Sequence, residues 1–103
     1  MTTWIDIAKT SALSNGERLT IHINGMDILV LNVDKQLYAI EDVCTHDGGD
    51  IAEGTVEQCQ IVCPRHGARF CLKTGDVISP PAYEALRRFP LRVTNNMIQI
   101  DID

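Results

Sequence analysis

Two short boxes of cysteine and histidine are the residues whose types and spacing could do chemistry in this chain. Cys44-Thr-His46 is followed, after sixteen residues, by Cys63-Pro-Arg-His66. Each box offers one thiolate and one imidazole, and both groups are ligands for transition metals. The chain has only four cysteines and three histidines, so chance rarely produces both boxes. The sequence therefore predicts a metal centre held by these four side chains.

Two kinds of metal centre use two cysteines and two histidines. One is structural zinc, and the other is a [2Fe–2S] cluster in which two histidines replace two cysteines on one iron. Zinc ligands usually come in pairs spaced C-x2–4-C or H-x3–5-H, so that both reach one ion. The C-x-H spacing is tighter than that, and the glycines beside the boxes suit a bulkier cluster. The cluster is favoured, and a Cys2His2 zinc module is the less favoured alternative.

The boxes and their surroundings resemble the Rieske family, from about Val43 to Pro81. The second box continues into a stretch similar to the family pattern H-G-x-x-F-x-x-x-T-G, which here reads His66-Gly-Ala-Arg-Phe-Cys-Leu-Lys-Thr-Gly75. Pro80-Pro81-Ala82 resembles the proline loop that covers the cluster in that family. The resemblance implies one Rieske-type [2Fe–2S] cluster per chain. It would place Cys44 and Cys63 on the inner iron and His46 and His66 on the outer iron.

Four departures separate the chain from the high-potential Rieske proteins of cytochrome complexes. Gly49 and Arg65 stand where those proteins have two cysteines that form a disulfide between the loops. Ala68 and Phe70 stand where those proteins have a serine and a tyrosine that donate hydrogen bonds to cluster sulfurs. Such bonds raise the potential, so we expect a value near the low end of the roughly −150 to +300 mV Rieske range. The chain resembles the ferredoxin branch of the family.

The resemblance implies a one-electron carrier and not an enzyme. Its nearest match in function would be the ferredoxin component of a ring-hydroxylating dioxygenase system, which passes electrons from a flavoprotein reductase to a terminal oxygenase. An oxygenase is excluded, because its non-haem iron needs two more histidines and only His22 remains. The runner-up is a general Rieske ferredoxin for iron–sulfur assembly or redox sensing. Cys59 and Cys71 are not assigned to the cluster and leave this runner-up open. They could be small buried residues, a disulfide or redox-sensing thiols.

Composition restricts the partners. The 103 residues suit a single domain, 1–103, with one modest core. The net charge of −5 argues against nucleic-acid binding and suits a carrier that meets a basic patch on a protein partner. No targeting segment and no apolar run of the roughly 18 residues that cross a bilayer are visible. We therefore expect a cytoplasmic monomer with no membrane contact.

Short apolar runs separated by turn residues predict an all-β fold, an antiparallel sandwich or barrel of the Rieske type. The expected strands are residues 19–23, 26–33, 36–40, 91–93 and 97–100. Asn24-Gly25 and Asn95-Asn96 are candidates for two-residue hairpin turns. Residues 82–88 could form one helical turn between prolines. Residues 42–81 hold all four cysteines and are expected to form a cluster-binding subdomain inserted between strands of a base.

Charged residues surround both boxes. The first box has four acidic neighbours and the second has two basic ones, which are Asp42, Asp47, Asp50 and Glu53, and Arg65 and Arg69. These side chains are expected to be solvated, with a docking role for some of them as the alternative.

Overall fold

The computed structural model describes residues 3–45, 47–80, 82 and 84–102, which form three antiparallel sheets. A terminal sheet has the order β1-β10-β9, and a central sheet has the order β2-β3-β4. A loop-bearing sheet has the order β5-β6-β7-β8. The strands are β1 (Trp4–Lys9), β2 (Arg18–Ile23), β3 (Met26–Val33), β4 (Gln36–Glu41), β5 (Thr55–Glu57), β6 (Gln60–Val62), β7 (Arg69–Cys71), β8 (Val77–Ser79), β9 (Leu91–Thr94) and β10 (Met97–Asp101).

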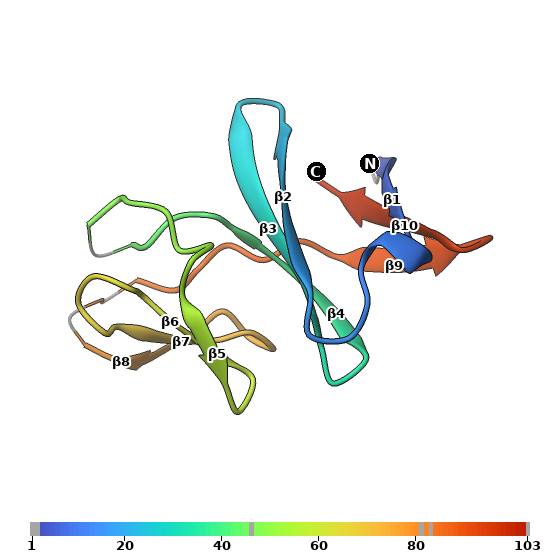
Figure 1. Cartoon of the computed structure of the whole chain (residues 1–103). Helices are drawn as coiled ribbons and strands as arrows, with labels where there is room; N and C mark the ends of the chain where they lie inside the picture. Colours follow the sequence, from blue (N-terminus) through green and yellow to red (C-terminus); the bar gives the residue numbers. More distant parts are fainter. Residues whose placement is uncertain (1–2, 46, 81, 83, 103) are drawn as a thin grey trace.

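The three sheets lie in a row (Figure 1). The loop-bearing sheet occupies one end, the terminal sheet occupies the other, and the central sheet lies between them. The expectation of an all-β antiparallel fold is confirmed: within the described residues the helical structure is one 3-10 turn, Thr10–Ala12. Among these same residues no helix has the length and apolarity to cross a membrane.

β3 is the central strand of the molecule because both of its faces are buried. Leu29 and Leu31 pack into a core shared with the loop-bearing sheet. Ile28 and Val30, which point to the opposite face, pack into a second core with Ile98 and the rest of the terminal sheet. The apolar run of this strand is thus explained by burial on two sides. The alternating pattern predicted for β2 is also observed, with its apolar residues facing the core.

The helical turn predicted within residues 82–88 is wrong for the residues described there, 82 and 84–88. The backbone of this segment bonds to other parts of the chain instead of to its own next turn. The Leu86 amide donates to the Gly75 carbonyl at 2.8 Å, and the Arg87 carbonyl accepts from the Glu41 amide at 2.9 Å. These bonds tie the segment to β4 and to the turn after β7, and they leave no partners for a helix.

Two-residue turns with positive φ at both positions connect four of the described hairpins. Asn24-Gly25 and Asn95-Asn96 form two of them, as their residue types predict, and Asp34-Lys35 forms a third, although lysine rarely adopts positive φ. The fourth is Gln58-Cys59, with φ of 51° and 61°, between β5 and β6. Neither glutamine nor cysteine favours this backbone conformation, so the sequence did not indicate a hairpin here.

The Gln58-Cys59 turn places a thiol against β4. Cys59 and Tyr38 both pack on the core between the central and loop-bearing sheets, and the two side chains are hydrogen-bonded. This bond is the main reason that the pKa of Tyr38 is raised to about 12, with burial second. Cys71, also half-buried, lies near enough to add to the effect. Both cysteines are free thiols.

Tyr38 should titrate at unusually high pH. In a Tyr83→Phe variant it is the only tyrosine left, so its ionisation can be followed by tyrosinate absorbance. We expect a midpoint of about 12 in place of the ordinary 10.0, and a return toward 10.0 on Cys59→Ala. Because the folded state holds this proton more tightly, the stabilisation is complete below pH 10.0 and is lost as pH rises through about 12. An unchanged midpoint in Cys59→Ala would contradict the contact.

Candidate metal centre

The two cysteine–histidine boxes lie in two loops with the same backbone hydrogen-bond pattern. Loop 1 is residues 44–49 and loop 2 is residues 63–68. In loop 1 the Cys44 amide donates to the carbonyl of Gly49 at 2.7 Å, and in loop 2 the Cys63 amide donates to the carbonyl of Ala68 at 2.7 Å. The fifth residue of each loop, Gly48 or Gly67, donates back to the cysteine carbonyl at 2.8 or 3.0 Å. Each loop therefore closes onto its own cysteine.

The two histidines occupy different positions within these matching loops. Both fifth positions are glycines with φ of 75°, a conformation that other residues rarely adopt. His46 is the third residue of loop 1, whereas His66 is the fourth residue of loop 2. The loop position that holds His46 in one loop therefore holds Arg65 in the other, and the position of His66 corresponds to that of Asp47.

The two thiols meet in the interior. Cys44 and Cys63 are 0% and 1% exposed and belong to the core that also contains Phe70. Burial raises the pKa of Cys63. The backbone N–H groups of Arg65 and His66 and a hydrogen bond with Cys44 outweigh that effect, so the net pKa is lowered. Donors aimed at a buried sulfur favour the thiolate, the form that binds metal.

His66 lies on the surface. Its side chain is 52% exposed, and its Nδ1 atom is 3.4 Å from Oδ2 of Asp47. The Asp47 carboxylate and the two thiols come within 4.8 Å of one another. Of the four predicted ligands, the structure thus brings the two cysteines together and places His66 at the surface of loop 2. His46 lies outside the described residues.

Arg65 joins the two loops through three hydrogen bonds. Its Nε and Nη2 atoms donate to the two carboxylate oxygens of Asp47 at 2.6 and 3.0 Å, and Nη1 donates to the Asp50 carbonyl at 2.8 Å. The bond to Arg65 is the main reason that the pKa of Asp47 lies well below its usual range, and the Asp47 carboxylate likewise raises the pKa of Arg65. The sequence indicated charges at both positions but not that they pair.

Other side chains fix the ends of loop 1. The Asp42 carboxylate accepts from the amides of Ile51 and Ala52 at 2.8 and 2.9 Å, so this residue has a structural role and is not a free surface charge. The Thr45 hydroxyl donates to the Glu84 carbonyl at 2.6 Å and ties loop 1 to the segment after the prolines. In that segment Ala82 is buried in the core with Cys44, while Pro81 lies outside the described residues.

Gly54 allows the ends of the two loops to approach each other. A Cβ atom on this residue would collide with the carbonyl oxygen of Val62 and would lie 3.0 Å from the carbonyl of Ile51. Val62 immediately precedes Cys63, so the missing side chain lets the start of loop 2 lie against the end of the segment that follows loop 1. Arg18 reinforces this junction from β2, because its Nη1 atom donates to the carbonyls of Ala52 and Gly54, each at 2.7 Å.

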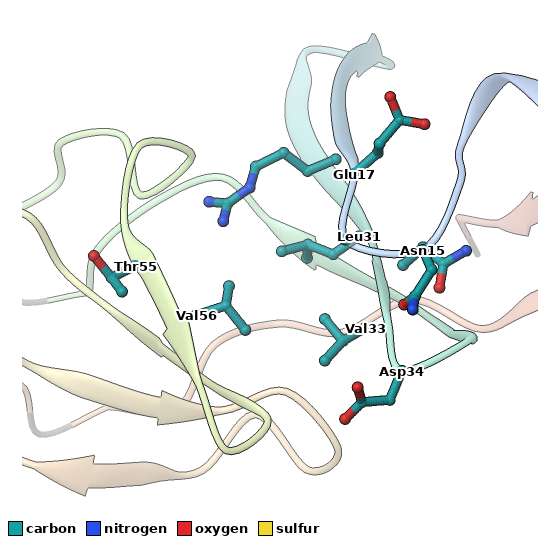
Figure 2. Close-up of a pocket in the computed structure, with 10 residues that line it drawn as sticks. Asn15, Glu17, Leu31, Val33, Asp34, Thr55 and Val56 are labelled. Atoms are coloured by element: carbon teal, nitrogen blue, oxygen red, sulfur yellow. The ribbon is translucent and has the colours of Figure 1, made fainter.

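A separate groove of about 480 Å³ lies between the start of β2, the end of β3 and the start of β5 (Figure 2). Leu31 and Val33 face Val56 across it, and Glu17 and Asp34 lie near its edge. None of the described residues that line it is a cysteine or a histidine. This groove is therefore separate from the candidate metal centre.

The residues present fit an iron–sulfur cluster. The donor set has two buried thiols, one of them with a lowered pKa, beside an exposed imidazole. A buried thiolate pair with an exposed histidine edge matches a cluster whose inner iron is bound by cysteine and whose outer iron is bound by histidine. Ala68 and Phe70 are both fully buried and bring no hydroxyl to this site.

Comparison with known proteins agrees with the loops. The family model described as the Rieske [2Fe-2S] domain matches residues 3–90. The 3-phenylpropionate/cinnamic acid dioxygenase ferredoxin subunit of Shigella boydii is 39% identical over 84% of this chain and 82% of its own length. The naphthalene 1,2-dioxygenase/salicylate 5-hydroxylase ferredoxin component of a Ralstonia species is 27% identical over 97% and 96%.

A solved structure is similar over nearly the whole chain. It is the complex of reduced oxygenase and oxidized ferredoxin in carbazole 1,9a-dioxygenase, in which the matching chain is 30% identical, with a TM-score of 0.88 and coverage of 95% of this chain and 92% of that one. The two curated relatives are named as a ferredoxin component and a ferredoxin subunit. The expected resemblance is confirmed, and the chain belongs to the Rieske [2Fe-2S] domain family, on its ferredoxin branch.

Proposed function

We propose that this chain carries one electron at a time on a single Rieske-type [2Fe–2S] cluster, bound by Cys44, His46, Cys63 and His66. The observation that supports this best is the pair of matched loops, which bring two buried thiols together below an exposed imidazole. When bound, the cluster supplies reversible one-electron chemistry. The role of the chain is to bind the cluster, exclude water from its inner side and present its outer side to a partner.

The distribution of burial indicates where the electron leaves. Core residues cover the cysteine side, with Phe70 and Leu72 fully buried behind the thiols. The His66 side chain is half exposed to solvent. The route to a partner is therefore shortest through the histidine edge, and a partner must cover that edge.

The partners follow from the relatives. Their names place them in dioxygenase systems, and one solved relative is in complex with an oxygenase. We propose the same place for this chain, between a flavoprotein reductase and a terminal oxygenase, as a cytoplasmic monomer. The net charge of −5 suits a basic docking surface on the partner.

The division of the chain into a base subdomain and a cluster-binding subdomain of about residues 42–81 also stays a prediction.

Metal analysis tests the cluster. We expect two irons and two sulfides per chain and a rhombic electron paramagnetic signal after reduction. Cys63→Ala should abolish both, because it removes a ligand. Cys71→Ala is the matched control, since it removes a thiol outside the loops and should retain iron and sulfide. One zinc ion per chain without sulfide would instead support the Cys2His2 zinc alternative.

Two buried positions should tune the potential. Ala68→Ser with Phe70→Tyr adds hydroxyls where high-potential Rieske proteins have them, so the reduction potential should rise. Protein-film voltammetry measures it. Phe89→Tyr is the control, because it adds a hydroxyl in the other core and should leave the potential unchanged. A well-folded double variant with an unchanged or lower potential would show that these positions do not face the cluster.

Electron transfer distinguishes the proposed pathway from a general ferredoxin. The loaded protein should be reduced by a dioxygenase-system flavoprotein reductase and reoxidised by the terminal oxygenase of the same system, as followed by stopped-flow absorbance. The rates should fall between about 0.1 and 1 M salt, where the Debye length shrinks from about 10 to about 3 Å. Reduction without any reoxidation by the oxygenase would favour the runner-up, a Rieske ferredoxin that serves another pathway.

A further inference from the structure

We propose that Arg65, Asp47 and Gly49 form a non-covalent clamp that holds loops 1 and 2 together and determines how long the bound cluster is retained. The inference deepens the proposed function and rests on it. None of the three residues is among the proposed ligands, so their role would be to position the ligands, not to bind iron.

The contacts of Arg65 span the gap between the loops. The backbone bonds from Cys44 to Gly49 and from Cys63 to Ala68 close each loop onto itself. The guanidinium of Arg65 instead crosses from loop 2 to loop 1, with two parallel bonds to the Asp47 carboxylate, and it makes a third bond to the carbonyl of Asp50, the residue that follows loop 1. Two-pronged bonds between arginine and a carboxylate fix geometry as well as charge.

Gly49 leaves open the space that the Arg65 guanidinium occupies. A Cβ atom there would lie 2.7 Å from Cζ, 2.8 Å from Nη2 and 3.1 Å from Nε of Arg65. Gly49, unlike Gly48, is not among the residues with positive φ, so its backbone conformation does not demand glycine. The need for glycine comes from Arg65. The Gly49 amide also donates to Oδ1 of Asp47 at 2.9 Å, which orients the carboxylate toward the arginine.

A second ion pair, between Arg69 and Glu57, serves as a comparison for the stabilisation expected from an ordinary exposed pair. Arg69 and Glu57 approach to 3.7 Å at one pair of atoms, and the Arg69 side chain is 36% exposed against 37% for Arg65. The acid partners differ: the Glu57 side chain is 55% exposed, whereas that of Asp47 is 19% exposed. Exposed single-contact pairs contribute little, whereas multiple charge-assisted bonds to a shielded carboxylate contribute more.

The first experiment compares cluster loss in two arginine variants of the loaded protein. Spontaneous loss is followed by the decay of visible absorbance, with iron and sulfide analysis at the end. Arg65→Met should speed the loss about tenfold, because opening the loops no longer breaks charge-assisted bonds. Arg69→Met should change it by about twofold or less. Arg65→Lys, which keeps the charge but not the fork, should fall between wild type and Arg65→Met.

The second experiment uses Gly49→Ala. The added methyl group meets only the flexible end of Arg65 among its nearest atoms, so the protein should fold and the guanidinium should be displaced. Cluster loss should then quicken as in Arg65→Met. In the Arg65→Met background the same alanine should add almost nothing, because the clamp is already absent. Far-ultraviolet circular dichroism of the loaded variants should match that of the wild type before cluster loss begins, which separates a weakened clamp from a misfolded chain.

The outcomes are distinguishable. A wild-type chain without iron and sulfide overturns the proposed function and the clamp with it. A wild-type chain that binds the cluster, with Arg65→Met and Arg69→Met losing it at equal rates, overturns the clamp and leaves the function standing. Additive effects of Gly49→Ala and Arg65→Met would likewise overturn it, because the two residues would then act independently.

Discussion

The backbone hydrogen bond that closes each loop onto its cysteine is the constraint on which the rest of the site depends. The amides of Cys44 and Cys63 reach across four residues to the last carbonyl of their loops. Once these bonds form, the two thiols lie inside, whereas the side chains of Arg65 and His66 reach the surface. The positive φ of Gly48 and Gly67, the close approach at Gly54 and the capping by Asp42 all serve to make or anchor these two closures.

Sequence reasoning predicted the strands that carry a strong pattern. The strand over residues 26–33 and the alternation over residues 19–23 agree with β3 and β2, because two-sided and one-sided burial leave distinct apolar patterns. The short strands β5 to β8 were not predicted individually. Each has three residues, too few for alternation to be visible, and the hairpin between β5 and β6 turns at Gln58-Cys59 without the usual asparagine or glycine.

The candidate donors of the metal centre stand out in the sequence, but the contacts between the loops do not. The type and spacing of cysteine and histidine indicate metal binding even when the fold is not known. Asp47 and Arg65 were expected to be solvated or to face a partner, yet each satisfies the other. Only the fold brings residues 18 positions apart into contact. Gly49 shows the same limit, since its need for glycine is set by a side chain from the other loop.

The double-sided burial of β3 has a consequence for how the molecule melts. Ile28 and Val30 belong to one core and Leu29 and Leu31 to the other, so neither core can open without exposing a face of the same strand. The central sheet thereby joins the loop-bearing sheet and the terminal sheet into one cooperative unit. The loop-bearing sheet, whose described strands have three residues each, packs on β3 through the first core, so its stability depends on a strand that the second core also holds.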